Sequence, residues 1–241
     1  MKKKEIWSFI GAGGKSTLIL LTAGKKAEEG KKVLITTTVH TAFTQQELRQ
    51  IGGCLTDGKE ASAAVLQGIS PVAAVEELPG ERGKQQGISE EDFQKAAAAA
   101  DLVLIEADGS RRRPFKAPGS HEPVIRPECS RIILTAGLTA LGQPVKDSCH
   151  RTAEVIKCTG KPESFPLTCE DMARVIREGY LKKCEECWPD IPVTVILNQA
   201  DEGELREKGL RVRELLEGSP AEVWLFSSKS RWKGRERWNM N

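Results

Sequence analysis

Residues 6–17 read IWSFIGAGGKST, and this stretch decides the fold that we predict for the chain. An apolar run leads into a glycine cluster, and the residues after the cluster favour a helix. Such a strand, loop and helix can bind phosphate, because glycines let consecutive N–H groups point into one concavity and the helix adds its positive dipole end. The predicted phosphate-binding residues are Gly11, Ala12, Gly13, Gly14, Lys15, Ser16 and Thr17.

Within this loop, Lys15 is predicted to contact the terminal phosphates, and the Ser16 hydroxyl to ligate a bridging Mg²⁺ ion. The loop departs from G-x-x-x-x-G-K-[ST], since Phe9 stands at the first glycine position. A dinucleotide loop, G-x-G-x-x-G, would need glycine at Ser16 and an acid after the second strand, where residues 36–38 are all threonine. A glycine turn without a ligand is disfavoured by the Lys-Ser-Thr that opens the helix. We therefore expect a nucleoside triphosphate, GTP or ATP, with Mg²⁺.

Composition narrows the class of protein. The 241 residues suit one α/β domain, and a net charge of +2 gives no general reason to expect nucleic acid or a membrane as partner. We find no signal peptide and no apolar run of the ~20 residues that a membrane span requires. Seven scattered cysteines favour reduced thiols in the cytoplasm. The pair Cys184 and Cys187 has no second pair at metal-binding spacing and is interpreted as structural.

Strands are predicted to alternate with helices along the chain, which indicates a mainly parallel sheet with helices on both faces. We therefore predict an α/β, P-loop NTPase-like fold in a single domain over residues 1–241, with a helical or irregular insertion at 41–88 and a basic tail at 230–241. The predicted strands span residues 6–10, 33–38, 72–76, 101–106, 132–135, 191–197 and 221–226. The predicted helices span residues 18–30, 45–50, 59–67, 89–100, 168–180 and 204–216.

Two acids lie at the end of the apolar strand predicted at 101–106. In a parallel sheet the carboxyl ends of the strands open onto the ligand crevice, where an acid can bind Mg²⁺ or its water. We predict Asp108 as the metal-binding and catalytic acid, with Glu106 second and Lys15 as the third catalytic residue. The alternative is an ordinary turn aspartate before Gly109.

A basic loop lies directly after Asp108. Four cations occur within residues 111–116, and neighbouring prolines stiffen the segment. Such a loop suits an anion, either a nucleotide phosphate or a phosphorylated substrate, although a solvated basic loop has the same charge. The predicted contacts are Arg111, Arg112, Lys116 and, shortly after them, His121.

Near the end of the chain, Asn198 and Asp201 follow a strand, and S-x-K follows the next one at residues 227–229. Guanine-binding proteins use this arrangement: the aspartate accepts hydrogen bonds from the base, and the asparagine supports the loop. Gln199 stands where a lysine normally stacks on the base. An Asx turn after the strand is the alternative interpretation.

Taken together, these segments resemble the YqeC family, assigned as accessory proteins of selenium-dependent hydroxylases. The resemblance rests on GAGGKST at 11–17, TTT at 36–38, EADGSRR at 106–112, KAP at 116–118, HEPVI at 121–125 and HR at 150–151. Arg113 and Phe115 depart mildly from the family pattern. The resemblance implies a bacterial cytoplasmic protein that acts in the maturation of selenium-dependent molybdenum hydroxylases.

Three functions are consistent with these patterns. The leading hypothesis is an enzyme, a Mg²⁺-dependent NTPase or phosphotransferase that helps to insert or activate a selenium or molybdenum cofactor species, alone or with a hydroxylase maturation partner. The second is a nucleotide-gated cofactor chaperone or carrier, since no general base stands out. The third is a module that binds RNA or DNA through the basic loop and the tryptophan-containing tail, and the near-neutral charge opposes it.

Overall fold

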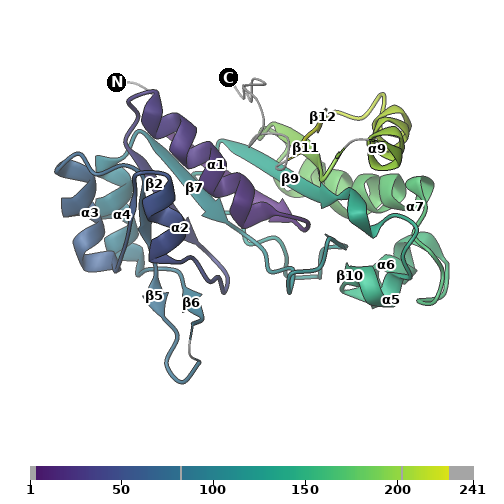
Figure 1. Ribbon diagram of the computed structural model, residues 1–241, viewed down its shortest axis with the longest axis horizontal. Helices are drawn as coiled ribbons and strands as arrows, with labels where there is room; N and C mark the ends of the chain where they lie inside the picture. Colours follow the sequence, from purple (N-terminus) through teal and green to yellow (C-terminus); the bar gives the residue numbers. More distant parts are fainter. Residues whose placement is uncertain (1–3, 82, 202, 228–241) are drawn as a thin grey trace. The chain divides into compact units, whose positions relative to one another are not determined.

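A computed structural model describes residues 4–81, 83–201 and 203–227 (Figure 1). The predicted basic tail at 230–241 lies outside these residues. Contacts within the chain define two compact units, which are described separately below. The first contains residues up to Ile10, Lys15–Gly109 and Ser120–Ile133, and the second contains Gly11–Gly14, Ser110–Gly119 and residues from Leu134 on. The single domain expected from the sequence stays a prediction.

The first unit is built on parallel strands whose order is β1-β7-β2-β4-β3. Its elements are β1 (Glu5–Gly11), α1 (Lys15–Glu28), β2 (Val33–Thr37), α2 (Gln45–Gln50), β3 (Cys54–Thr56), α3 (Gly58–Leu66), β4 (Val72–Ala74), β5 (Glu76–Glu77), β6 (Gln85–Gln86), α4 (Glu90–Ala99) and β7 (Leu102–Glu106). The strand β7 pairs in parallel with β1 on one side and β2 on the other, so that Glu106 is in register with both Phe9 and Thr37. The end of β7 therefore lies between the ends of β1 and β2.

Both faces of this sheet are covered, because every residue of β2 and β7 is buried. Helix α1 contacts both strands, and α3 packs beside α4, as Figure 1 also shows. Helix starts follow the predicted caps, since the Ser89 hydroxyl accepts a hydrogen bond from the Asp92 amide at the start of α4. The predicted α/β fold with a mainly parallel sheet is confirmed.

The segment 41–88 is more regular than the sequence predicts. Its helices α2 and α3 lie where we expect them, but β3 and β4 extend the parallel sheet beside β2, and β5 and β6 form an antiparallel pair. The strand β4 lies within the stretch 72–76 that is predicted as a strand, whereas β3 was missed because its three residues are too short for hydrophobic alternation to reveal it.

The second unit has a sheet with strand order β12-β11-β9 and a separate pair, β8 with β10. Its elements are β8 (Phe115–Lys116), β9 (Arg131–Gly137, which begins in the first unit), the 3₁₀ helix η1 (Leu138–Ala140), α5 (Val145–Ser148), β10 (Cys149–His150), α6 (Thr152–Thr159), α7 (Cys169–Arg174), the π-helix η2 (Val175–Leu181), α8 (Lys182–Cys187), β11 (Val193–Asn198), α9 (Glu204–Leu215) and β12 (Glu222–Leu225). The strands and helices predicted beyond residue 130 are confirmed.

The cysteines differ widely in exposure. All seven are free thiols, and Cys187 is exposed at the end of α8 whereas Cys129, Cys149 and Cys184 are buried. Burial raises the pKa of Cys54, Cys129, Cys149, Cys158 and Cys169 above the ordinary value. Within the part of the chain that the structure describes, no helix is both long and apolar enough to span a membrane.

Candidate functional site

The glycine loop has the backbone conformation that requires glycine. Gly11, Gly13 and Gly14 have φ angles of +87°, +87° and +108°, in a region that residues with a side chain rarely adopt. The Ala12 amide donates to the Thr135 carbonyl at 2.8 Å, which fixes the loop to β9 within the second unit. Residue type and backbone conformation therefore agree in this loop.

The loop is also tightly enclosed by other segments of the second unit. A Cβ atom added to Gly13 would lie 2.4 Å from the Gly137 Cα and 2.4 Å from the Pro114 carbonyl oxygen. Asn198 donates from Nδ2 to the Gly13 carbonyl at 2.7 Å, and a Cβ at Gly14 would lie 2.4 Å from the same Nδ2. The structure thus places Asn198 against the glycine loop, and its predicted role in recognising guanine stays a prediction.

In the first unit, Lys15 lies between two carboxylates. Its Nζ is 3.2 Å from Asp108 Oδ1 and 3.8 Å from Glu106 Oε1. The Lys15 and Asp108 side chains are 2% and 0% exposed, and that of Glu106 is 9% exposed. This cluster forms because β7 lies next to β1, and the residues after β7 therefore reach the start of α1.

Two hydroxyl groups complete the cluster. Thr41 Oγ1 donates to Glu106 Oε2 at 2.8 Å, and Ser16 Oγ donates to the same oxygen at 3.5 Å. Burial raises the pKa of Glu106, while Lys15 and the Thr41 hydrogen bond oppose that rise. Thr41 was not predicted as a site residue, because its contact depends on the long connection between β2 and α2.

The donor set fits Mg²⁺ bound together with a phosphate ligand. Among the described residues, no group of three or more His, Cys, Asp or Glu side chains could hold a metal ion alone. Magnesium commonly takes one or two protein oxygens and completes its shell with phosphate and water. The Ser16 hydroxyl and the two carboxylates supply oxygens of this kind, and Lys15 supplies a cation for the phosphates.

A cavity of about 540 Å³ lies at the carboxyl end of β2 in the first unit. Its lining includes Thr37, His40, Phe93 and Arg126. The Thr37 hydroxyl donates to the Glu106 backbone carbonyl at 2.9 Å, so one wall of the cavity adjoins the end of β7. The sequence did not predict this cavity, because its wall combines segments that are far apart in the chain.

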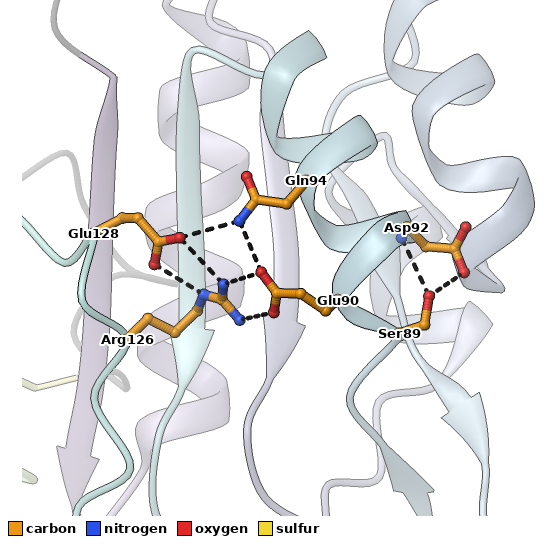
Figure 2. Close-up of polar contacts among 6 residues, drawn as sticks. All are labelled: Ser89, Glu90, Asp92, Gln94, Arg126 and Glu128. Atoms are coloured by element: carbon orange, nitrogen blue, oxygen red, sulfur yellow. Dashed lines mark hydrogen bonds and ion pairs between the residues drawn. The ribbon is translucent and has the colours of Figure 1, made fainter.

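Arg126 is held in this wall by a polar network (Figure 2). Its guanidinium makes two hydrogen bonds with Glu90, at 2.8 and 2.9 Å, and further hydrogen bonds with Glu128. It also stacks 3.7 Å from the centre of the Phe93 ring. The hydrogen bonds from Arg126 lower the pKa of Glu90 to about 2. Because each of the three guanidinium nitrogens already donates a hydrogen bond, we interpret Arg126 as a fixed part of the wall.

The other predicted site residues lie in different surroundings. Arg111 and Arg112 are exposed in the second unit, whereas the Lys116 side chain in β8 is fully buried. His121 is exposed and belongs to the first unit. Asp201 accepts a hydrogen bond from the Ser227 hydroxyl. Ser228 and Lys229, which complete the predicted S-x-K, lie outside the described residues.

A model of the YqeC protein family matches residues 7–153. The chain belongs to the YqeC family. The YqeC protein of Escherichia coli (strain K12) is 31% identical over 196 residues, which cover 78% of this chain and 75% of that protein. The family match contains the glycine loop, the carboxylate cluster and the basic loop, whereas Asn198 and Asp201 lie beyond it.

A solved structure with similarity to this YqeC protein is that of FtsY from Mycoplasma mycoides. It has a TM-score of 0.31 and 14% sequence identity. The alignment covers 93% of this chain and 52% of the FtsY chain, so this YqeC protein spans about half the length of that chain. In the present chain, the strand, glycine loop and helix at the N-terminus indicate that the protein binds a nucleotide.

Proposed function

We propose that this YqeC protein binds a magnesium nucleoside triphosphate and cleaves or transfers its terminal phosphate. The buried cluster of Lys15 with Asp108 and Glu106 carries the proposal, because a lysine that opens a helix directly after a glycine loop is suited to phosphate. Burying three charged groups is costly unless they pair. The binding of phosphate and Mg²⁺ would give each of these groups a new partner of opposite charge.

The chain's own residues have separate roles in this proposal. Backbone amides of the glycine loop orient the phosphates, and Lys15 balances their charge. Ser16 and Asp108 would hold Mg²⁺, which neutralises the charge that develops on the phosphate oxygens. Glu106 has a pKa raised by burial, and this makes its carboxylate a stronger proton acceptor than an ordinary glutamate. Glu106 is therefore the best candidate for the general base that the sequence does not reveal.

We further propose, on the family membership, that this reaction serves cytoplasmic maturation of selenium-dependent molybdenum hydroxylases. The nucleotide would drive insertion or activation of a selenium or molybdenum cofactor species. Phosphate release with and without an apo-hydroxylase tests this step, and we expect the apo-hydroxylase to stimulate release. Nucleotide binding without turnover in either condition would instead favour a nucleotide-gated carrier.

The central experiment replaces Lys15 with glutamine. Lys15→Gln removes the charge and keeps an N–H donor on a somewhat shorter side chain. We expect nucleotide affinity to fall by about tenfold or more, as for the loss of a charged hydrogen bond. Lys25→Gln is the matched control, because Lys25 lies in the same helix with a partly exposed side chain. Equal affinities of the two variants for MgATP and MgGTP would refute the phosphate-loop assignment.

A further inference from the structure

A second cavity, of about 470 Å³, lies within the second unit, and four of its nine described lining residues are cations. Arg111 and Arg113 come from the basic loop, Lys146 from α5, and His150 and Arg151 from the end of β10. Its volume is in the range of small-molecule sites, which is roughly 300–1,000 Å³. The sequence analysis predicted only part of this set, as the basic loop. Of the loop residues predicted there to bind an anion, neither Arg112 nor Lys116 lines the cavity.

The pairing of β8 with β10 explains why these cations converge. The two strands are parallel, with Phe115 opposite Cys149 and Lys116 opposite His150. The basic loop leads into β8 and α5 leads into β10, so both segments reach the strand pair from the same end. Arg113 also donates a hydrogen bond to the Asp147 carbonyl, which ties the basic loop to α5.

The backbone conformation of Arg151 and its packing against Gly119 hold its side chain in place. Its φ angle is +60°, a left-handed conformation that is uncommon for a residue with a side chain. Its guanidinium lies against Gly119, where an added Cβ would be 3.0 Å from Nε. A glycine therefore provides the room that the Arg151 side chain occupies.

The charge on the cavity wall is strongly positive. Arg111, Arg113, Lys146 and Arg151 are cations, and Glu154 is the only acid in the described lining. Burial raises the pKa of the Cys149 thiol to about 11, so this thiol is neutral and does not reduce the positive charge. Like charges at this density repel one another, and an anion in the cavity would relieve the repulsion.

We propose that this cavity binds the phosphate group of a small molecule, as a second ligand site separate in its residues from Lys15 and Ser16. Arginine forks match phosphate oxygens in geometry, and they are supplied here by two chain segments. A metal ion would be repelled by the same wall. A small local group of cations suits a compact anion better than a nucleic acid, which requires charge along an extended face.

Histidine NMR on the full-length protein provides a direct test. The chain has three histidines, so His40 and His121 serve as internal references for His150. Inorganic phosphate, added at constant pH and ionic strength, should shift the His150 ring signals in a saturable way and leave His40 unchanged. A His150→Gln variant assigns the signals.

Two charge reversals and one matched control locate the effect. Arg111→Glu and Lys146→Glu should each weaken phosphate binding by about tenfold or more, as for a lost charged contact. Arg112→Glu is the control, because Arg112 is the exposed neighbour of Arg111, shares its positive φ angle and does not line the cavity. Lys15→Gln should also leave the His150 response intact, which separates this site from the proposed nucleotide site.

Several results would overturn the proposal. One is a His150 response to chloride equal to that with phosphate, which would show general screening. Another is an equal loss in Arg112→Glu and Arg111→Glu, which would assign binding to the charge of the loop as a whole. A third is a His150 shift caused by a single-stranded oligonucleotide and not by phosphate, which would identify a nucleic-acid surface.

Discussion

Lys15 and Asp108 form an ion pair whose two side chains are almost completely buried, with Nζ 3.2 Å from Oδ1. The pair lies at the start of α1, where the proposed phosphates would bind. Lys15 and Asp108 are therefore neutralised by each other before any ligand is present. A magnesium nucleotide would replace this single contact by two, phosphate with Lys15 and metal with Asp108.

The first prediction concerns Asp108→Asn. Asparagine keeps the shape of the side chain but supplies no charge to a metal ion, so Mg²⁺-dependent activity should fall by about tenfold or more. Nucleotide binding in the presence of EDTA should change little. Isothermal titration and phosphate release, each with and without Mg²⁺, measure the two quantities. Equal losses in both conditions would show that Asp108 has a structural role.

The second prediction concerns pH and Glu106. Because the folded protein holds the Glu106 pKa above its ordinary value of 4.5, the folded state binds the proton more tightly than the unfolded state. This contribution to stability is complete below pH 4.5 and is lost as the pH rises through the folded pKa. Glu106→Gln should remove a slope of up to about 1.4 kcal/mol per pH unit in that window.

Urea unfolding from pH 4.5 upwards, without nucleotide or Mg²⁺, measures this slope. Glu77→Gln is the control, because Glu77 is exposed in β5. Parallel curves for Glu106→Gln and the parent protein would contradict the raised pKa.

The third prediction concerns Gly13→Ala. The added methyl would meet Gly137 and Pro114 at 2.4 Å, and the residue would keep a φ angle of +87°. We expect a loss of roughly 2–4 kcal/mol in the free energy of unfolding. Gly52→Ala separates strain from crowding, because Gly52 has a φ angle of +77° with nothing within 4 Å, and it should lose only about 1 kcal/mol. Equal losses would show that the close contact has no energetic effect.

The fourth prediction concerns the base. Guanine can donate two hydrogen bonds to Asp201, whereas adenine has no 2-amino group and presents an acceptor at its ring nitrogen. GTP should therefore bind about tenfold tighter than ATP, and Asp201→Asn should remove the difference. Ser227→Ala is the control, since the Ser227 hydroxyl donates to Asp201. Equal displacement of a labelled nucleotide by GTP, ATP and CTP would leave residues 198–201 as an ordinary turn.

The fifth prediction concerns Arg126→Ala. Loss of the contacts to Phe93, Glu90 and Glu128 should lower the free energy of unfolding by about 1–2 kcal/mol at neutral pH. Arg126 lowers the pKa of Glu90 to about 2, so its stabilisation is present above the ordinary value of 4.5 and is lost as the pH falls toward 2. The variant should lack this acid-dependent loss. Lys95→Ala is the control, because its pair with Glu91 is exposed on the same helix and should contribute little.

Features that depend on residues adjacent in the chain could be predicted from the sequence. The strand, glycine loop and helix at the N-terminus depend on neighbouring residues, and so do the helix caps at Ser89 and Thr168. The acids at the end of β7 could be placed near Lys15 only by assuming a strand order, and the observed order puts β7 beside β1.

Contacts between distant segments could not be predicted in this way. Thr41 reaches Glu106 across 65 positions, and Asn198 reaches Gly13 across 185, and no local pattern encodes such a separation. The cationic cavity depends on the pairing of two strands with two residues each, which are too short to detect by periodicity. The basic loop alone therefore predicted an anion, but not the full set of residues that we propose to bind it.

The unequal burial of the seven thiols makes selective chemical labelling of one cysteine possible. Cys187 is exposed, whereas the other six thiols are buried or half-buried, and burial raises the pKa of five of them. A maleimide dye should consequently attach to Cys187 first, since the thiolate is the reacting form and needs access to the reagent. One fluorophore at the end of α8 would then be obtained from the unmodified sequence, without removing a single native cysteine.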